Sequence, residues 1–149
     1  MTTSIQFYHL LHTPLERALP KLVERVLAQN SRALVRTASD AQAEQLCDQL
    51  WTHDPNSFLP HGTAKDGHVS EQPVFLTPTR DNPNGSDILI ITDGSMAEDA
   101  AAFSKVLDMF DGQDENAVAA ARVRWAAYKE AGHSIAYNKQ QPGGGWAAA

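Results

Sequence analysis

Apolar residues in this chain switch between the spacing of buried strands and that of amphipathic helices. Short runs rich in branched and aromatic side chains predict strands at residues 4–10, 32–37, 73–77 and 87–92. Helical spacing predicts helices at residues 14–29, 40–51, 97–104 and 114–131. Residues 105–110 are compatible with a continuation of the third helix and with an edge strand, and periodicity does not decide between them.

The predicted helices have identifiable ends. Thr13 precedes Pro14, a proline at the first helical position, and is therefore expected to cap the first helix. Pro20 lies inside the same pattern, which leaves open whether the helix proper begins there. Asp114 is expected to cap the last helix, and Gly132 is expected to end it.

The order of these elements predicts the fold class. Strands alternate with helices along most of the chain, which is typical of an α/β domain with a mostly parallel central sheet covered on both faces. We therefore expect residues 1–138 to form a single three-layer, Rossmann-like domain. Residues 139–149, rich in Gly and Ala, are expected to form a disordered tail.

The last predicted helix carries an unusual stripe. At about 100° per residue, one side of it holds Arg122, Trp125, Ala126 and Lys129. A buried stripe would not hold two cations, and a solvated stripe seldom holds a tryptophan. The combination favours a site for an acidic partner that carries an apolar group. The competing interpretation is that Trp125 packs against the sheet while the cations extend into solvent.

Composition narrows the function classes. The 149 residues include 18 acidic and 12 basic side chains, for a net charge of −6. That balance argues against a protein-wide basic surface for nucleic acid, so contact with DNA is expected to be indirect. The single cysteine, Cys47, excludes an internal disulfide and is expected to be a buried thiol. Without a signal-peptide pattern or a run of about 18 apolar residues, we expect a cytoplasmic protein with no membrane span.

Motifs that would carry chemistry are scarce. The first strand-to-helix turn, residues 9–14, has no glycine, so the phosphate loop of a nucleotide-binding domain is missing and no cofactor is expected. His9 and His12 at a strand end do not form a chelating pair, and neither a metal site nor a catalytic residue is predicted. Asp93 and Ser95 follow the clearest strand at its carboxyl end. A hydrolase-like α/β enzyme is therefore the alternative function, although a turn with a helix cap explains both residues more simply.

Several segments, taken in order, match one family. They are residues 7–10 (Phe-Tyr-His-Leu), 33–37 (Ala-Leu-Val-Arg-Thr), 49–51 (Gln-Leu-Trp), 57–61 (Ser-Phe-Leu-Pro-His), 86–90 (Ser-Asp-Ile-Leu-Ile) and the stretch 122–132 (Arg-x-Arg-Trp-x-x-Tyr-Lys-x-Ala-Gly). No single segment is specific, but their order and spacing resemble the chi subunit of bacterial DNA polymerase III. The resemblance implies a nucleotide-binding-like fold without a nucleotide and a non-catalytic accessory role in DNA replication.

The resemblance also implies partners. Chi subunits connect the clamp loader, through the psi subunit, to the acidic C-terminal tail of single-stranded DNA-binding protein, which ends in aspartates and a Pro-Phe carboxylate. The residues expected to hold this tail are Trp51, Trp125 and Tyr128 for the phenylalanine ring and Arg122, Arg124 and Lys129 for the carboxylates. Chi subunits carry a lysine directly after the aromatic residue that matches Trp125, where this chain has Ala126. Arg122 and Lys129 are therefore expected to hold the carboxylate end. The psi subunit, or another clamp-loader subunit, is the second partner that the resemblance implies.

Overall fold

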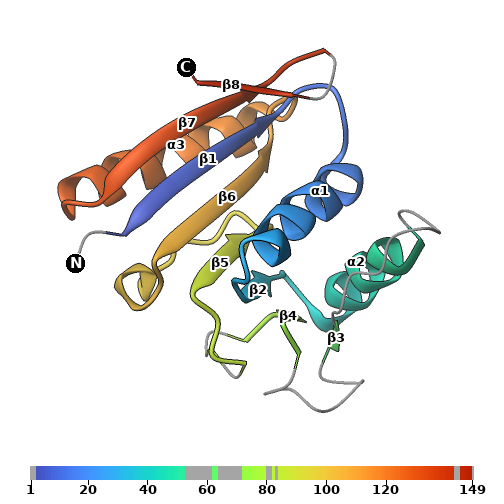
Figure 1. The fold of residues 1–149 in the computed structure, drawn as a ribbon. Helices are drawn as coiled ribbons and strands as arrows, with labels where there is room; N and C mark the ends of the chain where they lie inside the picture. Colours follow the sequence, from blue (N-terminus) through green and yellow to red (C-terminus); the bar gives the residue numbers. More distant parts are fainter. Residues whose placement is uncertain are drawn as a thin grey trace.

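The computed structural model describes residues 3–52, 62–63, 72–79, 82, 84–142 and 145–148. Its strands are β1 (Ser4–Leu10), β2 (Ala33–Arg36), β3 (Gly62–Thr63), β4 (Val74–Thr77), β5 (Ile88–Ile91), β6 (Lys105–Asp111), β7 (Ser134–Gln140) and β8 (Trp146–Ala148). Its helices are α1 (Leu15–Ala28), α2 (Asp40–Thr52), α3 (Glu115–Glu130) and the short 3-10 turn η3 (Ala100–Ala102). Figure 1 shows how these elements follow one another.

One eight-stranded sheet runs through the described residues, in the order β3-β4-β2-β5-β6-β1-β7-β8. Neighbouring strands from β3 to β7 are all parallel, and β8 runs antiparallel to β7 at the edge. Parallel strands need crossover connections, and α1, α2 and α3 lie in the β1–β2, β2–β3 and β6–β7 connections. The predicted α/β class with a mostly parallel central sheet is therefore confirmed.

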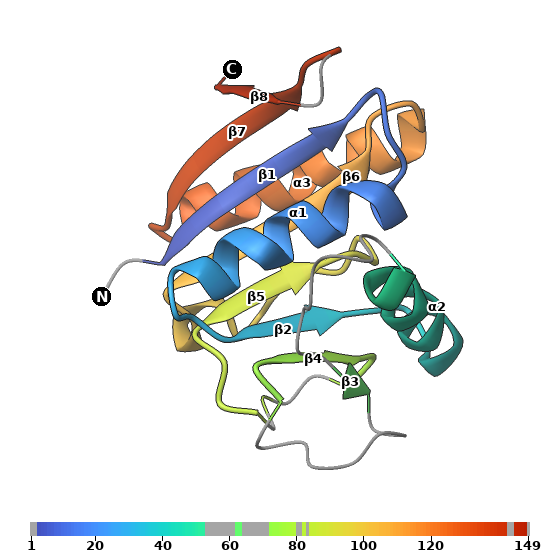
Figure 2. The same cartoon turned by 45° about the vertical axis from the view of Figure 1, so that its right-hand side comes forward.

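Helices cover both faces of the sheet. α1 and α2 pack on one face, where Leu22 and Leu46 belong to a common buried cluster. α3 packs on the opposite face against β6 and β7, in a second cluster that contains Phe7 and Tyr128. In Figure 2, α1 lies on the near side of the sheet and α3 on the far side. Two sites on α2 and α3 are therefore separated by the sheet itself.

The helix ends agree only partly with the sequence predictions. α1 begins at Leu15 and continues through the buried Pro20, so the helix starts five residues before that proline. Asp114 caps α3 as predicted, because its side chain accepts hydrogen bonds from two backbone amides of the first turn. Gly132 follows α3 with a φ of +89°, a backbone conformation that favours glycine, and so it ends the helix as predicted.

Thr13 does not cap α1. Pro14 occupies the capping position and makes no side-chain cap. The amides of Leu11, His12 and Thr13 donate instead to Oε1 of Gln140, at 2.9, 2.8 and 3.1 Å. Nε2 of Gln140 donates in turn to the Thr13 hydroxyl at 2.6 Å. The threonine hydroxyl is thus used to attach the β1–α1 loop to β7, a partner far away in sequence.

The segment between β5 and β6 differs from the predicted helix at residues 97–104. Within this segment only Ala100–Ala102 form a helical turn, the 3-10 turn η3. Backbone carbonyls of this segment bind a residue that is distant in the sequence. The Thr3 hydroxyl donates to the carbonyls of Ala100 and Phe103, both at 3.0 Å. The following residues form β6, which lies between β5 and β1 and is buried from Val106 to Phe110. Residues 105–110 are therefore a central strand, and neither a helix nor an edge strand.

The C-terminal residues also differ from the predicted disordered tail. Lys139 and Gln140 complete β7, and residues 146–148 form β8 on its outer edge. Gln140 is only 3% exposed, since it holds the β1–α1 loop. Trp146 packs edge-on against Tyr8, with the ring centroids 4.9 Å apart. These contacts carry the folded unit beyond residue 138.

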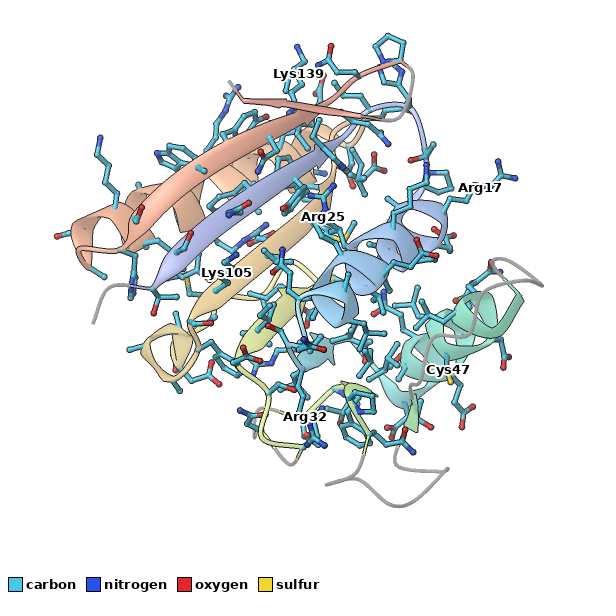
Figure 3. All side chains as sticks on the ribbon, in the orientation of Figure 1. Arg17, Arg25, Arg32, Cys47, Lys105 and Lys139 are labelled. Carbon is cyan, nitrogen blue, oxygen red and sulfur yellow. The ribbon has the colours of Figure 1, made fainter. Side chains whose placement is uncertain are left out.

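Two further observations bear on the sequence predictions. Cys47 is buried on α2, as predicted for the single thiol (Figure 3). Within the part of the chain that the structure describes, no helix combines the length and the apolarity that crossing a membrane requires.

Candidate functional site

The side of α3 that faces the sheet is offset from the stripe that the sequence analysis identified. Ala121, Arg124 and Tyr128 are buried in that contact. Their spacing of three and four residues is that of one helix face. Arg122 and Lys129 are exposed, and Trp125 is half-buried. The predicted stripe therefore runs beside the contact line, with Trp125 at the boundary between core and surface.

Arg124 is a core residue. Its side chain is 6% exposed and pairs with the fully buried Asp108, to which Nε donates at 2.7 Å and Nη2 at 3.0 Å. Nη1 donates to the carbonyl of Gly94 at 2.9 Å. Burial raises the pKa of Asp108, and the Arg124 guanidinium opposes that rise. Because its donors are already used inside the fold, this placement argues against the predicted role of Arg124 in peptide binding.

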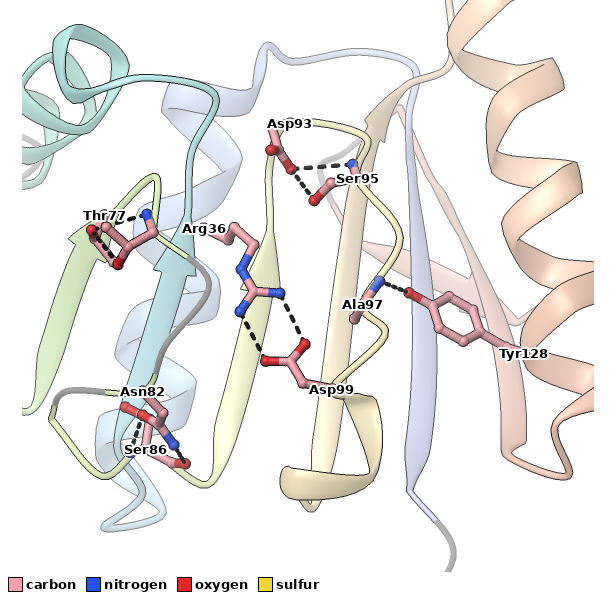
Figure 4. A network of polar contacts seen from close by, with 10 residues as sticks. Arg36, Thr77, Asn82, Ser86, Asp93, Ser95, Ala97, Asp99 and Tyr128 are labelled. Atoms are coloured by element: carbon pink, nitrogen blue, oxygen red, sulfur yellow. Dashed lines mark hydrogen bonds and ion pairs between the residues drawn. The ribbon is translucent and has the colours of Figure 1, made fainter.

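Tyr128 is also part of the core. It is 1% exposed, and its hydroxyl accepts a hydrogen bond from the backbone amide of Ala97 at 2.9 Å (Figure 4). Burial raises the pKa of this hydroxyl. Tyr128 thus attaches the β5–β6 connection to α3, which argues against its predicted place in a peptide pocket.

Trp51 lies on a different part of the molecule. It belongs to α2, which packs with α1 on the face of the sheet opposite α3. Trp51 and Trp125 are predicted from the sequence to share one pocket. The arrangement of α2 and α3 does not bring the two residues together, because the sheet separates their helices.

Trp125 borders a cavity of about 400 Å³ between α3 and the sheet. We call this cavity the Trp125 pocket; it is lined by Phe7, His9, Phe110, Val118, Ala121, Arg122, Trp125 and Tyr137. The Trp125 ring lies 5.5 Å from the Phe7 ring and 6.0 Å from the Tyr137 ring, measured between centroids. A site of this size with aromatic walls and a few polar groups is typical of ligand pockets.

Two cations stand beside this aromatic pocket. Arg122 lines it from α3. Lys139 is paired in register with His9 across the β1–β7 ladder, so the two side chains share the α3 face of the sheet. Burial lowers the pKa of His9, and the charges of Lys139 and Arg122 lower it further. Figure 3 labels Lys139 on β7, close to β8. Lys129, four residues beyond Trp125, is exposed on α3.

A larger cavity, of about 820 Å³, opens at the carboxyl ends of β1, β5 and β6. Its lining includes the carboxylates of Glu16, Asp93, Asp111 and Asp114 and the guanidinium of Arg124. Because Arg124 already pairs with Asp108, this cavity is electrostatically unsuited to an acidic ligand.

Asp93 and Ser95, the residues of the alternative enzyme function, bind one another. Oδ1 of Asp93 accepts from the Ser95 hydroxyl at 2.7 Å and from its amide at 3.1 Å (Figure 4). Gly94 between them has a φ of +74°, as a tight turn requires. The hydroxyl thus donates to a neighbouring carboxylate, which is turn chemistry. In the same described portion of the chain, no group of three or more His, Cys, Asp or Glu side chains is arranged to hold a metal ion.

Most of the pocket was not predicted from the sequence. The wall on the sheet side is formed by residues of three strands. They are Phe7 and His9 on β1, Phe110 on β6 and Tyr137 on β7. One signal was available, since Ile135 and Tyr137, two residue types that favour strands, stand two positions apart after Gly132. A strand at this place would have put Ile135, Tyr137 and Lys139 on a common face.

Comparison with known proteins identifies a related family. The model of the family described as DNA polymerase III chi subunit, HolC, matches residues 1–136. The match ends immediately before Tyr137, so the last residues of β7 and all of β8 lie outside it.

Individual relatives agree with the family match. The chain is 32% identical over 123 residues to the DNA polymerase III subunit chi of Escherichia coli (strain K12), which covers 79% of this chain and 83% of that protein. It is 24% identical over 139 residues to the chi subunit of Haemophilus influenzae, covering 91% and 96%. A probable chi subunit of Rickettsia prowazekii is 31% identical over 90 residues, and the matched stretch spans only about half of that protein, 54%.

Proposed function

This chain belongs to the DNA polymerase III chi subunit family, and from that membership we propose that it is a non-catalytic replication subunit that binds the acidic C-terminal tail of single-stranded DNA-binding protein. In this role it links the tail to the clamp-loader complex in the cytoplasm. The Trp125 pocket is the proposed binding site. The observation that carries the proposal is an aromatic cavity with cations beside it, on a protein whose net charge is −6.

The pocket suits a peptide that ends in a phenylalanine carboxylate. The ring of the terminal residue would lie among Phe7, Trp125 and Tyr137, where offset and edge-on contacts between rings are favourable. The guanidinium of Arg122 would bind the terminal carboxylate through two parallel hydrogen bonds. The aromatic walls bury the phenylalanine ring, and Arg122 neutralises the terminal carboxylate. We therefore expect the peptide to need both its ring and its carboxylate for binding.

Lys139 supplies a positive charge in place of the lysine that this chain lacks at position 126. Ala126 stands where chi subunits carry a lysine, so α3 offers one cation fewer than the family pattern implies. Lys139 lies on β7 in register with His9, which lines the pocket. We therefore assign the ligand's negative charges to Arg122 and Lys139, with the exposed Lys129 placed for the aspartates that precede the terminal residue. Trp51, Arg124 and Tyr128 are left out of the proposed site.

A peptide titration tests the proposal. A peptide ending in Asp-Asp-Ile-Pro-Phe is titrated against the wild type, Trp125→Ala and Arg122→Met, and we expect each substitution to weaken binding by about tenfold or more, equivalent to about 1.4 kcal/mol. Trp146→Phe is the matched control, because Trp146 packs against Tyr8 with the α1–α2 cluster on the other face of the sheet. Amidation of the peptide's terminal carboxylate should weaken binding to the wild type as strongly as Arg122→Met does.

Two results would contradict the proposed site. A folded wild-type protein that does not bind the peptide excludes the function, and unchanged affinity of both α3 variants excludes the pocket. Binding should also weaken as salt is raised, because the charges at the pocket mouth are screened.

The proposal includes a second partner and an indirect relation to DNA. The psi subunit, or another clamp-loader subunit, is the expected link to the polymerase complex, and single-stranded DNA-binding protein is the link to DNA. Co-purification of the tagged chain with clamp-loader subunits tests the first link. A gel shift at low salt tests the second: no shift of single-stranded DNA by the chain alone is expected, and a shift would show direct binding.

A further inference from the structure

A histidine lies in the floor of the Trp125 pocket. His9 extends from β1 onto the α3 face, where its ring lies 4.9 Å from the Phe110 ring and 5.6 Å from the Tyr137 ring, between centroids. Nδ1 of His9 is hydrogen-bonded to the Tyr137 hydroxyl. Nε2 is buried without a hydrogen-bond partner among the described residues. The imidazole is therefore fixed in place, with one nitrogen attached to a hydroxyl that lines the same pocket.

The backbone beneath the ring leaves it little freedom. A Cβ on Gly112 would collide with the edge of the imidazole and would lie 2.6 Å from the carbonyl oxygen of Leu10. Glycine at this position thus leaves room for the edge of the His9 ring beside the turn that follows β6.

The surroundings of this imidazole disfavour its protonated form. Burial lowers the pKa of His9, and the nearby charges of Lys139 on β7 and Arg122 on α3 lower it further. The Gly112 backbone acts in the opposite direction and raises the pKa, although its geometry falls short of a hydrogen bond to Nε2. Tyr137 and Phe110 complete the surroundings. Both charged groups that act on His9 are thus cations, and an anionic ligand would reverse their effect.

We propose that His9 and Tyr137 form a proton-linked carboxylate receptor in the Trp125 pocket, so that His9 takes up a proton from solvent when an acidic peptide binds. The inference rests on the proposed function, because it concerns the same pocket and the same class of ligand. It adds a recognition element that belongs to β1 and β7, outside the cationic stripe of α3.

The mechanism follows from the donor and acceptor roles of the two side chains. In this proposal the Tyr137 hydroxyl is assigned as the donor to Nδ1 of the neutral imidazole in the free protein, and the ring hydrogen is assigned to Nε2. When the ring gains a proton, Nδ1 becomes a donor to the Tyr137 oxygen. The hydroxyl hydrogen is then released to donate to a carboxylate oxygen in the pocket. Burial raises the pKa of Tyr137, so this hydroxyl keeps its hydrogen throughout.

Proton uptake gives binding a defined pH dependence. The peptide carboxylate raises the pKa of His9 in the complex, so the complex binds more protons than the free protein in the interval between the two pKa values. Affinity therefore increases as pH falls from about 8 to about 5.5, with a gain of about tenfold for each unit by which binding raises the pKa. The peptide's own carboxylates titrate near pH 4 and lie below this interval.

The test compares peptide affinity at pH 8 and pH 5.5 for four forms of the full chain. We expect the wild type and His12→Gln, a matched control on an exposed histidine, to bind about threefold or more tightly at pH 5.5. His9→Gln should bind equally at both pH values. Tyr137→Phe should lose the gain as well, because the ring remains but the hydroxyl that is released by protonation is absent.

A second measurement uses the wild type alone, so that a misfolded variant does not decide the question. The His9 Cε1 proton signal is titrated by NMR with and without peptide, and the pKa of His9 should be higher in the complex. An unchanged pKa, or a pH gain that persists in His9→Gln, overturns the inference. Wild-type binding that is independent of pH overturns it while the proposed function stands. Absence of binding at every pH overturns both.

Discussion

Arg124→Met tests whether Arg124 stabilises the fold or binds a ligand. Arg124 and the fully buried Asp108 are joined by two short hydrogen bonds, and a third bond holds the Gly94 carbonyl. The substitution leaves a buried carboxylate without its cation, which destabilises proteins by about 3–5 kcal/mol. For a chain of this size, each kcal/mol lowers the melting temperature by roughly 2–4 °C, so we expect a loss of roughly 6–20 °C.

The assay combines thermal unfolding with peptide titration below the melting temperature. Arg122→Met is the matched control on the exposed side of the same helix, and its stability should stay within about 0.5 kcal/mol of the wild type while it loses peptide affinity. Arg124→Met should show the reverse. The double variant Asp108→Leu/Arg124→Met should recover most of the lost stability, because apolar replacement of both partners removes the uncompensated charge. A melting temperature of Arg124→Met close to that of the wild type, with peptide binding lost, would refute this reasoning.

Four further substitutions should change the stability of the fold. Asp114→Ala removes the cap of α3 and should lower the free energy of unfolding by about 1 kcal/mol in urea titration; no change would show that the cap is not needed. Gln140→Ala leaves three backbone amides of the β1–α1 loop without their acceptor, and denaturation should reveal a loss of about 1–3 kcal/mol, whereas a disordered tail would show none. Gly112→Ala should cost about 1–3 kcal/mol through its collision with Leu10, measured as a lower melting temperature. The folded-state pKa of His9 lies below its unfolded value of about 6.5. The unfolded chain therefore binds more protons, and the stability contributed by neutral His9 is lost as pH falls below about 6.5 toward the folded-state pKa. His9→Gln should accordingly lose less stability than the wild type between pH 7.5 and pH 5.5.

Local patterns predicted much of the fold. Ile88–Ile91 form a buried strand because a run of branched side chains suits a parallel sheet covered on both faces. α1 follows from its helical spacing, and α3 follows from its helical spacing together with the Asp114 cap and Gly132. The elements that were missed depend on distant partners. η3 is short because Ala100 and Phe103 meet Thr3, and Gln140 is buried because the β1–α1 loop lies over it.

The candidate site was predicted only on its helical side. Arg122 and Trp125 were identified because their combination is unusual on a single helix face. Helix periodicity did not reveal that the contact line with the sheet lies one position away, which buries Arg124 beside Asp108. The opposite wall comes from β1, β6 and β7, and its residues meet only when the sheet is assembled. No spacing within one segment of the sequence contains that information.

Mapping the peptide onto the isotope-labelled chain by NMR tests the central claim most directly. The indole signals of Trp51, Trp125 and Trp146 report on α2, the Trp125 pocket and β8 respectively. On addition of the peptide ending in Asp-Asp-Ile-Pro-Phe, the account predicts the largest shifts at the Trp125 indole and at the backbone amides of His9, Arg122 and Tyr137. Shifts centred on Trp51 or Trp146, with the Trp125 indole unchanged, would contradict it.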